Sequence, residues 1–413
     1  MKKQEILVLG AGMVGTSMAL ELSLRGHDVT LVDRRMPGQE TSFGNAGVIQ
    51  REAVEPYAMP QRLSFLCKVL LRREASVNYH LRALLETSPQ LWQYWRASAP
   101  ASHQRLSRHY AALIAHATET HARLIEVAQA SALIRKTGIR MLYRSAAAFE
   151  AACLDAERLQ CTHGINFLAL DSTALERAEP DFQMRLPGAL HWLDSWSASD
   201  PGALVDHYFQ TFQRLGGRFV IGDACSLRPV GSSWWMETAN GPVQAPQVVI
   251  ALGPWAGQLT AQLGYRLPLF VKRGYHRHYV GGGTVSVPTL DTERGYVMAP
   301  QRRGLRITTG AEIARMQDRP TPTQLTQAEQ EADKLLGLGT PVEEVPWVGA
   351  RPCVADMLPV IGPAPRHRGL WFNFGHGHQG FTLGPASARL LADLMEGVTP
   401  FVLPEAYAPA RFV

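Results

Sequence analysis

Short apolar runs bounded by glycine and polar residues recur along the chain and predict buried strands. Residues 6–9 are apolar in succession, which is the length of a buried parallel strand, and a second strand is predicted over residues 28–32. Between them, small and apolar residues at helical spacing run from Met13 to Arg25, and Gly26 is a suitable residue to end this helix. The chain therefore opens with a strand, a helix and a second strand.

Similar patterns predict the later strands. Asn240-Gly241 is typical of a tight hairpin turn. Several strands after residue 265 are polar on one face, and we expect them to form either the wall of a pocket or a half-solvated surface. In one of them, alternation places Tyr275 on one side and His276 on the other. The predicted strands cover residues 218–222, 234–238, 248–252, 272–280, 295–299, 305–310 and 370–374.

Helical patterns dominate residues 50–140, which we interpret as an insertion. Residues 62–73 have a basic amphipathic pattern, which fits either a helix in a membrane interface or a helix packed on its own domain with a solvated basic face. A long helix is predicted over residues 106–130. Its histidines lack a metal-ligand spacing, so we expect no metal site. The other predicted helices cover residues 146–160, 201–215, 326–336 and 382–395.

A glycine motif follows the first strand. Gly10, Gly12 and Gly15 have the G-x-G-x-x-G spacing, and Asp33 follows the last of them by about twenty residues, as a ribose-hydroxyl acceptor requires. The free N–H groups at the start of the next helix would receive a pyrophosphate. The motif predicts a bound dinucleotide, but it does not separate FAD from NAD, and Arg34 with Arg35 could indicate a 2′-phosphate.

Two more glycine-rich segments suggest close approach to a ligand. Residues 41–47 form a loop soon after the first motif, although an ordinary flexible connection would have the same composition. Residues 375–380 lie between a predicted strand and a predicted helix, so a second helix N-terminus would point at something that needs close backbone approach.

Composition sets further limits. The 413 residues suggest two or three domains, and the net charge of +5 suits an anionic substrate or membrane surface but is too modest to indicate nucleic acid. The five cysteines are scattered without a C-x-x-C pair, which fits reduced thiols in a cytoplasmic protein. No run approaches the roughly eighteen apolar residues of a membrane span, and no signal-peptide core is present.

Taken in order, these motifs resemble the D-amino acid oxidase superfamily of FAD enzymes, and within it the bacterial D-amino acid dehydrogenase-like group. The resemblance covers nearly the whole chain and implies FAD rather than NAD. The residues that carry it are 10–15 with Asp33, 41–47, 248–255, 347–352 with 359–362, and 375–380.

The resemblance implies an α/β fold in which a Rossmann-type FAD-binding domain is interleaved with an α+β substrate domain containing a mixed or antiparallel sheet. Residues 1–50, 196–262 and 341–413 would form the first domain, and residues 51–195 and 263–340 the second. Cys353 does not occupy the position of the flavin-linking cysteine of sarcosine oxidases, so we expect non-covalent FAD. The expected cofactor residues are Gly10, Gly12, Met13, Val14, Gly15, Asp33, Arg34, Ser42, Asn45, Ala46, Gly47, Gly253, Trp255, Gly375, Gly377, Gln379 and Gly380.

The resemblance also assigns the chemistry. Arg351 stands where several relatives bind the substrate carboxylate, a role that suits a planar guanidinium; the alternative is a structural salt bridge, for example to Asp356. Tyr275, His276, Tyr296 and His376 are candidates for the pocket or else wall or core residues. The hypothesis is hydride transfer from Cα of a small D-amino acid or cyclic imino acid, such as D-proline or hydroxyproline, to flavin N5.

The resemblance further implies that electrons pass to a quinone or another carrier. We expect a cytoplasmic protein, possibly peripheral on the inner face of the membrane through residues 62–73; the oligomeric state is left open. One alternative is the catalytic subunit of a multi-subunit amine, opine or hydroxyproline dehydrogenase. Another is a non-catalytic flavoprotein that binds a membrane or nucleic acid.

Overall fold

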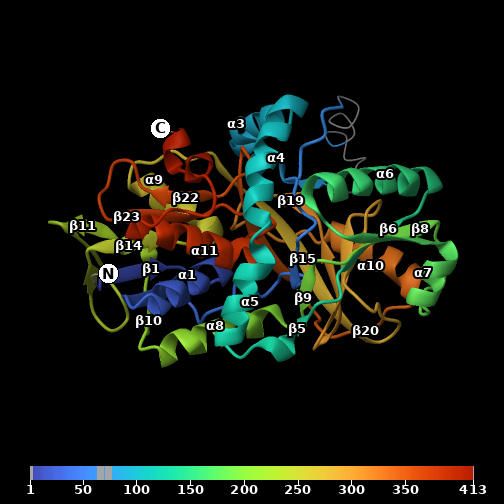
Figure 1. Ribbon diagram of the computed structural model, residues 1–413, viewed down its shortest axis with the longest axis horizontal. Helices are drawn as coiled ribbons and strands as arrows, with labels where there is room; N and C mark the ends of the chain where they lie inside the picture. Colours follow the sequence, from blue (N-terminus) through green and yellow to red (C-terminus); the bar gives the residue numbers. More distant parts are fainter. Residues whose placement is uncertain (1–2, 63–68, 70–76, 413) are drawn as a thin grey trace.

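The computed structural model describes residues 3–62, 69 and 77–412 (Figure 1). One of its two main sheets has six strands in the order β10-β2-β1-β14-β23-β22, and all neighbours are parallel except β22 and β23. Its central strands are apolar and largely buried, as is usual for a parallel sheet covered by helices, whereas the edge strand β10 is partly exposed. They are β1 (Glu5–Leu9), β2 (Asp28–Asp33), β10 (Arg218–Ile221), β14 (Gln247–Ile250), β22 (Val360–Pro363) and β23 (Leu370–Phe374).

Two helices from opposite ends of the chain lie side by side on this sheet. They are α1 (Met13–Leu24) and α11 (Gly380–Glu396), drawn in blue and red in Figure 1. A Cβ atom at Gly384 would lie 2.8 Å from Met13 Cγ, so only glycine permits this close packing. A third helix, α8 (Pro201–Arg214), also packs on α1, and its N-cap Asp200 accepts a hydrogen bond from Ala203 N.

The other main sheet has eleven strands in mixed orientation, in the order β4-β19-β15-β18-β17-β16-β6-β8-β7, with β20 and β21 also paired to β15. The helix α10 (Thr323–Leu336) covers its apolar core, and α6 (Ala146–His163) and α7 (Ser172–Ala178) pack beside β6, β7 and β8. The short helix α9 (Ala256–Gln262) belongs instead to the apolar core of the six-stranded sheet. The strands are β4 (Val77–Tyr79), β6 (Ile139–Tyr143), β7 (Phe167–Asp171), β8 (Gly188–Trp192), β15 (Leu269–Gly281), β16 (Thr289–Asp291), β17 (Tyr296–Gln301), β18 (Gly304–Thr309), β19 (Ala311–Ile313), β20 (Gly339–Pro341) and β21 (Trp347–Val354).

Two small three-stranded sheets complete the strand pairing. The hairpin predicted at Asn240-Gly241 joins two strands of one of them, and Gly241 has φ +98°. That sheet contains β11 (Arg228–Val230), β12 (Ser233–Met236) and β13 (Val243–Ala245), and the other contains β3 (Val48–Ile49), β5 (Ile134–Arg135) and β9 (Trp196–Ala198).

The predicted single helix over residues 106–130 is wrong. The chain forms α4 (Pro100–Ile114) and α5 (Ala117–Val127), which follow α3 (Leu81–Ala97). The break falls at His116, whose ψ of 2° is not helical and whose ring packs edge-on against Phe401 at 4.6 Å. The apolar stripe stays in phase across the break, which is why periodicity alone does not reveal it.

The strand pairing of the large sheet concerns the domain boundary expected at residue 341. Strands β20 and β21 pair with β15, so the chain leaves the large sheet after Val354 and not at residue 341. We propose that this point is the last boundary between the two units. Most of residues 62–73 lies outside the described residues, so the structure does not test the basic amphipathic helix. Within the described ranges, no helix combines the length and apolar character needed to span a membrane.

Candidate active site

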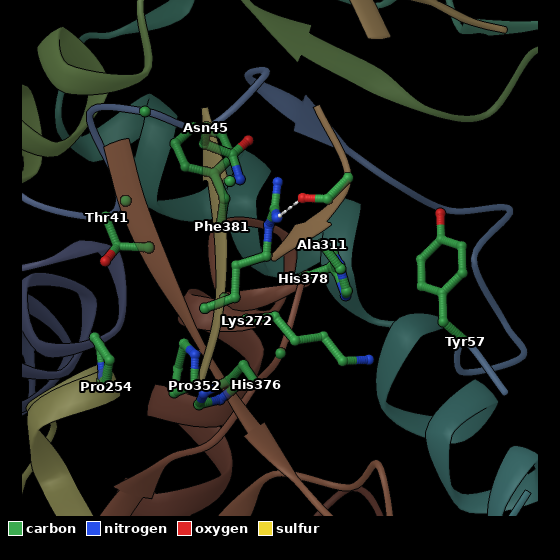
Figure 2. Close-up of a pocket in the computed structure, with 18 of the residues that line it drawn as sticks. Thr41, Asn45, Tyr57, Pro254, Lys272, Ala311, Pro352, His376, His378 and Phe381 are labelled. Carbon is green, nitrogen blue, oxygen red and sulfur yellow. Dashed lines mark hydrogen bonds between the residues drawn. The ribbon is translucent and has the colours of Figure 1, made fainter. Parts of the chain in front are cut away.

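A cavity of about 1660 Å³ is lined from both main sheets and from α3 (Figure 2). Ligand pockets commonly enclose about 300–1,000 Å³, so this cavity has room for a large cofactor together with a substrate. Both faces of β15 are largely buried, and Lys272, Gly274 and Tyr275 line the cavity. The polar strand is therefore a pocket wall and not a half-solvated surface.

Most of the expected cofactor residues line this cavity. Gly15, Gly47, Gly375 and Gln379 do not, and their roles are in packing or in hydrogen bonds behind the wall. The expected residues that line it are Gly10, Gly12, Met13, Val14, Asp33, Arg34, Ser42, Asn45, Ala46, Gly253, Trp255, Gly377 and Gly380.

The first glycine turn fits a pyrophosphate. Gly10 has φ +104°, and a Cβ atom at Gly15 would lie 1.8 Å from Gly10 O, so the turn requires glycine at both positions. The helix α1 begins after Gly12, which has no side-chain cap, and its first turn carries no acidic residue. Its N-terminus thus presents a positive dipole end to the cavity.

Asp33 ends β2 beside this turn. Its Oδ2 atom accepts a hydrogen bond from Ala11 N at 2.6 Å, and burial raises the pKa of Asp33 although backbone hydrogen bonds oppose the shift. Arg34 pairs with Glu40 at 2.6 Å and lies over the Trp255 ring at 4.2 Å. Arg34 is thus already engaged by a carboxylate and an aromatic face.

The loop of residues 41–47 is held by a residue that the sequence analysis did not identify. The Arg306 guanidinium donates hydrogen bonds to Phe43 O, at 2.8 Å, and to Asn45 O. Arg306 is buried in β18, and burial lowers its pKa to about 9. An arginine within the strand predicted over residues 305–310 was the available signal. Gly47 supports the loop by packing, since a Cβ atom there would lie 2.5 Å from Ala198 O.

The C-terminal glycine loop presents α11 to the same cavity. Its first turn has no acidic residue, and Gln379 Nε2 donates at 2.6 Å to Oε1 of Gln50, which lines the cavity. Three buried polar atoms here have no hydrogen-bond partner: His376 Nε2, Gln379 Oε1 and Asn373 Oδ1. Burial lowers the pKa of His376 to about 3, so its ring is neutral at physiological pH.

Arg351 lies in β21 with its side chain in the cavity. Its Nη1 and Nη2 atoms donate to Gly310 O at 2.8 Å and to Thr309 O at 2.9 Å. The expected alternative, a salt bridge to Asp356, is wrong because that carboxylate pairs with Arg411 at 2.7 Å. The guanidinium is therefore fixed in place while no described acidic side chain neutralises it.

The remaining substrate candidates differ in position. Tyr275 lines the wall, but its hydroxyl donates to Glu312 Oε2 at 2.6 Å. His276 and Tyr296 do not line the cavity: His276 stacks on Trp347 with centroids 4.7 Å apart, and Tyr296 is buried in the core under α10. Strand periodicity alone does not show which face of each strand meets the cavity.

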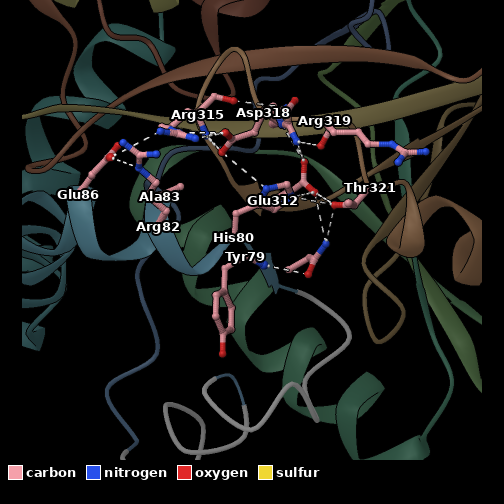
Figure 3. Close-up of polar contacts among 12 residues, drawn as sticks. Tyr79, His80, Arg82, Ala83, Glu86, Glu312, Arg315, Asp318, Arg319 and Thr321 are labelled. Carbon is pink, nitrogen blue, oxygen red and sulfur yellow. Dashed lines mark hydrogen bonds and ion pairs between the residues drawn. The ribbon is translucent and has the colours of Figure 1, made fainter.

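Glu312 organises a buried polar cluster behind this wall (Figure 3). It pairs with Arg273 at 2.7 Å and accepts a hydrogen bond from Thr321. In Figure 3, Arg315 and Asp318 lie beside this group and pair at 2.7 Å. The cluster joins β19 to β15 next to the carbonyl groups that hold Arg351. No group of His, Cys, Asp and Glu side chains in the described part of the chain has the geometry of a metal site.

The model of one protein family, described as FAD dependent oxidoreductase (DAO), matches residues 5–394. The chain belongs to this family. Its cofactor is FAD and its fold is the expected α/β architecture, so both expectations are confirmed. The glycine turns, the two helix N-termini without an acidic residue in their first turn and the unpartnered buried polar atoms fit such a group. FAD would be held by the cavity-lining residues of the two turns, Asp33 and the 41–47 loop.

Individual relatives are similar over nearly the whole chain. A D-amino acid dehydrogenase from Cereibacter sphaeroides is 31% identical over 96% of this chain and 92% of the relative. A D-amino-acid oxidase from Bradyrhizobium diazoefficiens is 28% identical over 99% of each. Among solved structures, glycine oxidase from Geobacillus kaustophilus has a TM-score of 0.71 at 19% identity over 100% of both chains. L-proline dehydrogenase from P. horikoshii has a TM-score of 0.74 at 18% identity over 100% of this chain and 98% of the other.

Proposed function

We propose that the protein oxidises a small amino or imino acid at its α-carbon, with the α-carboxylate held by Arg351. The observation that carries the proposal is a guanidinium fixed by two backbone carbonyl groups inside the FAD cavity, with no acidic partner among the described residues. A planar guanidinium grips a carboxylate with two parallel charge-assisted hydrogen bonds and so fixes the orientation of the substrate.

When bound, FAD supplies the acceptor for two electrons. The substrate loses these electrons and two protons to become an imino acid, which water then cleaves to a 2-oxo acid and ammonia. A cyclic substrate would remain an imine. The names of the relatives, D-amino acid dehydrogenase and D-amino-acid oxidase, support a D-amino acid as the substrate.

The cavity offers no described base that titrates near neutral pH. Burial lowers the pKa of His376 to about 3 and that of His378 well below its usual range, and burial raises the pKa of Tyr275 to about 12. A group whose pKa lies that far from neutral pH makes an inefficient general base. The substrate would therefore react with its amine already neutral, and kcat/KM would rise with pH toward the pKa of the substrate amine.

The electron acceptor would be a quinone or another carrier, with access at the membrane surface. Leu81, Leu85 and Trp92 on α3 are 62%, 66% and 58% exposed, and α3 also lines the cavity. Exposed apolar residues on a helix suit contact with a bilayer surface. In a flotation assay with anionic liposomes the protein would rise with the vesicles, and its absence from that fraction would contradict the contact.

Replacement of Arg351 by methionine tests the proposed function. We expect KM to rise by about 100-fold or more, because two hydrogen bonds from a charged group are each worth about 1.5–3 kcal/mol. FAD content would stay unchanged. Arg303→Met is a matched control, since this arginine is half exposed outside the cavity. Unchanged kinetics in Arg351→Met would contradict the proposal that Arg351 binds the substrate α-carboxylate.

A further inference from the structure

We infer that the substrate carries a second acidic group, which Lys272 binds, so that the preferred substrate is a dicarboxylic amino acid. The inference rests on the proposed function for the α-carboxylate and adds a residue that determines specificity. Two cationic residues, Lys272 and Arg351, occupy paired positions in the cavity wall.

Lys272 and Arg351 are directly opposite each other in the antiparallel pair β15 and β21. Residues in this relation project from the same face of a sheet with Cβ atoms about 4.5–5.5 Å apart, and like charges there are destabilising. Both side chains line the cavity. A fold that retains this pairing carries an electrostatic cost that an anionic ligand would offset.

The two charged groups are held by different neighbours. The Arg351 guanidinium is bound by the carbonyl groups of Thr309 and Gly310. The Lys272 ammonium instead lies 4.3 Å from the centroid of the Tyr94 ring and donates to the Tyr94 hydroxyl at 3.3 Å. Figure 2 shows Lys272 extending from β15 toward the side of the pocket where Tyr57 lies. The wall thus offers two anion positions and not one shared position.

No described acidic side chain pairs with either cation. Among the described residues, the acidic ones that line the cavity are Asp33, Glu40 and Asp223, which lie at the ends of β2 and β10 or after them, on the glycine-turn side of the six-stranded sheet. His378 lies in the same wall as the two cations and stays neutral, because burial and then the two positive charges lower its pKa. Half-buried cations without an anionic partner are costly, and a ligand with two carboxylates would neutralise both.

The experiment compares substrates of matched shape. D-glutamate and D-glutamine differ by one negative charge, and Lys272→Gln removes the proposed partner of that charge. We expect the protein with bound FAD to favour D-glutamate by at least tenfold in kcat/KM. In Lys272→Gln, kcat/KM for D-glutamate would fall at least tenfold while that for D-glutamine changes little. Lys334→Gln on α10 is the charge-matched control, with its side chain 64% exposed.

Two kinetic outcomes with the unaltered protein and Lys272→Gln would overturn the inference. One is a preference of the unaltered protein for D-glutamine. The other is an equal loss on both substrates in Lys272→Gln, which would mean that Lys272 shares the α-carboxylate. Lys272→Met, which keeps the apolar stem, separates loss of charge from loss of packing: it should reproduce the kinetics of Lys272→Gln, and unchanged selectivity would also overturn the inference.

Binding of a substrate analogue distinguishes this inference from the proposed function. Calorimetric titration should show glutarate binding at least tenfold more tightly than butyrate, with the difference lost in Lys272→Gln. If no amino acid reduces the flavin but this difference holds, the proposed oxidation fails and the two-anion site stands. If amino acids reduce the flavin while glutarate and butyrate bind equally, the proposed oxidation stands and the two-anion site is overturned.

Discussion

Gly274 is the residue whose replacement most directly tests how Arg351 is positioned. A Cβ atom at position 274 would lie 2.5 Å from Arg351 Nη1, 2.6 Å from Nη2 and 2.7 Å from Cζ. Gly274 does not have a positive φ, so alanine introduces no backbone strain there. Gly274→Ala should therefore push the guanidinium away from the carbonyl groups of Thr309 and Gly310 and leave the strand intact.

The magnitude follows from the hydrogen bonds that depend on this position. A displaced guanidinium loses its two-point grip on the carboxylate, and at about 1.5 kcal/mol for each bond the loss is about 3 kcal/mol. Since about 1.4 kcal/mol is tenfold, kcat/KM should fall roughly 100-fold, mostly through KM. Steady-state kinetics with a dye acceptor, together with FAD content and the melting temperature, would measure this.

A matched control is available for the same substitution. At Gly257 in α9 an added Cβ atom would make ordinary contact with Leu269 Cδ1 at 3.7 Å, so Gly257→Ala should leave kinetics unchanged. The reasoning would be refuted if Gly274→Ala kept its KM and its FAD while Arg351→Met raised KM strongly.

Three other expectations can be measured directly. Arg306→Met should release the 41–47 loop and so weaken FAD retention during gel filtration at least tenfold. The control variant Arg303→Met should retain FAD. Equal FAD retention in the two variants would contradict the anchoring role of Arg306. Burial lowers the pKa of His121 to about 4 in the folded protein. Between that pH and about 6.5, the imidazole of His121 is therefore protonated in the unfolded chain but not in the folded one. Stability should then fall on acidification by up to about 1.4 kcal/mol per pH unit, and denaturant titrations at pH 5 and 7 should show a smaller fall in His121→Gln. Acid precipitation should leave the flavin in the supernatant, because Cys353, the candidate nearest to the flavin-linking position of sarcosine oxidases, does not line the large cavity. A yellow precipitate would indicate a covalent bond.

The sequence predicted the parts of this site that depend on local backbone rules. Gly10 and Gly15 are read from spacing, because a tight turn and close helix packing need residues without a Cβ atom. Lys272 and Arg306 escaped notice, because alternation within one strand does not show which neighbours cover each face. For the same reason the pattern allows either a pocket or a core position for Tyr296, and it packs in the core under α10.

The adjacency of α1 and α11 has a consequence for biosynthesis. The first glycine turn and α1 emerge early from the ribosome, but α11, which packs against α1, is encoded more than 350 codons later. A nascent chain shorter than about 400 residues would expose the apolar side of α1 to chaperones. FAD would accordingly bind only after translation of the chain has ended.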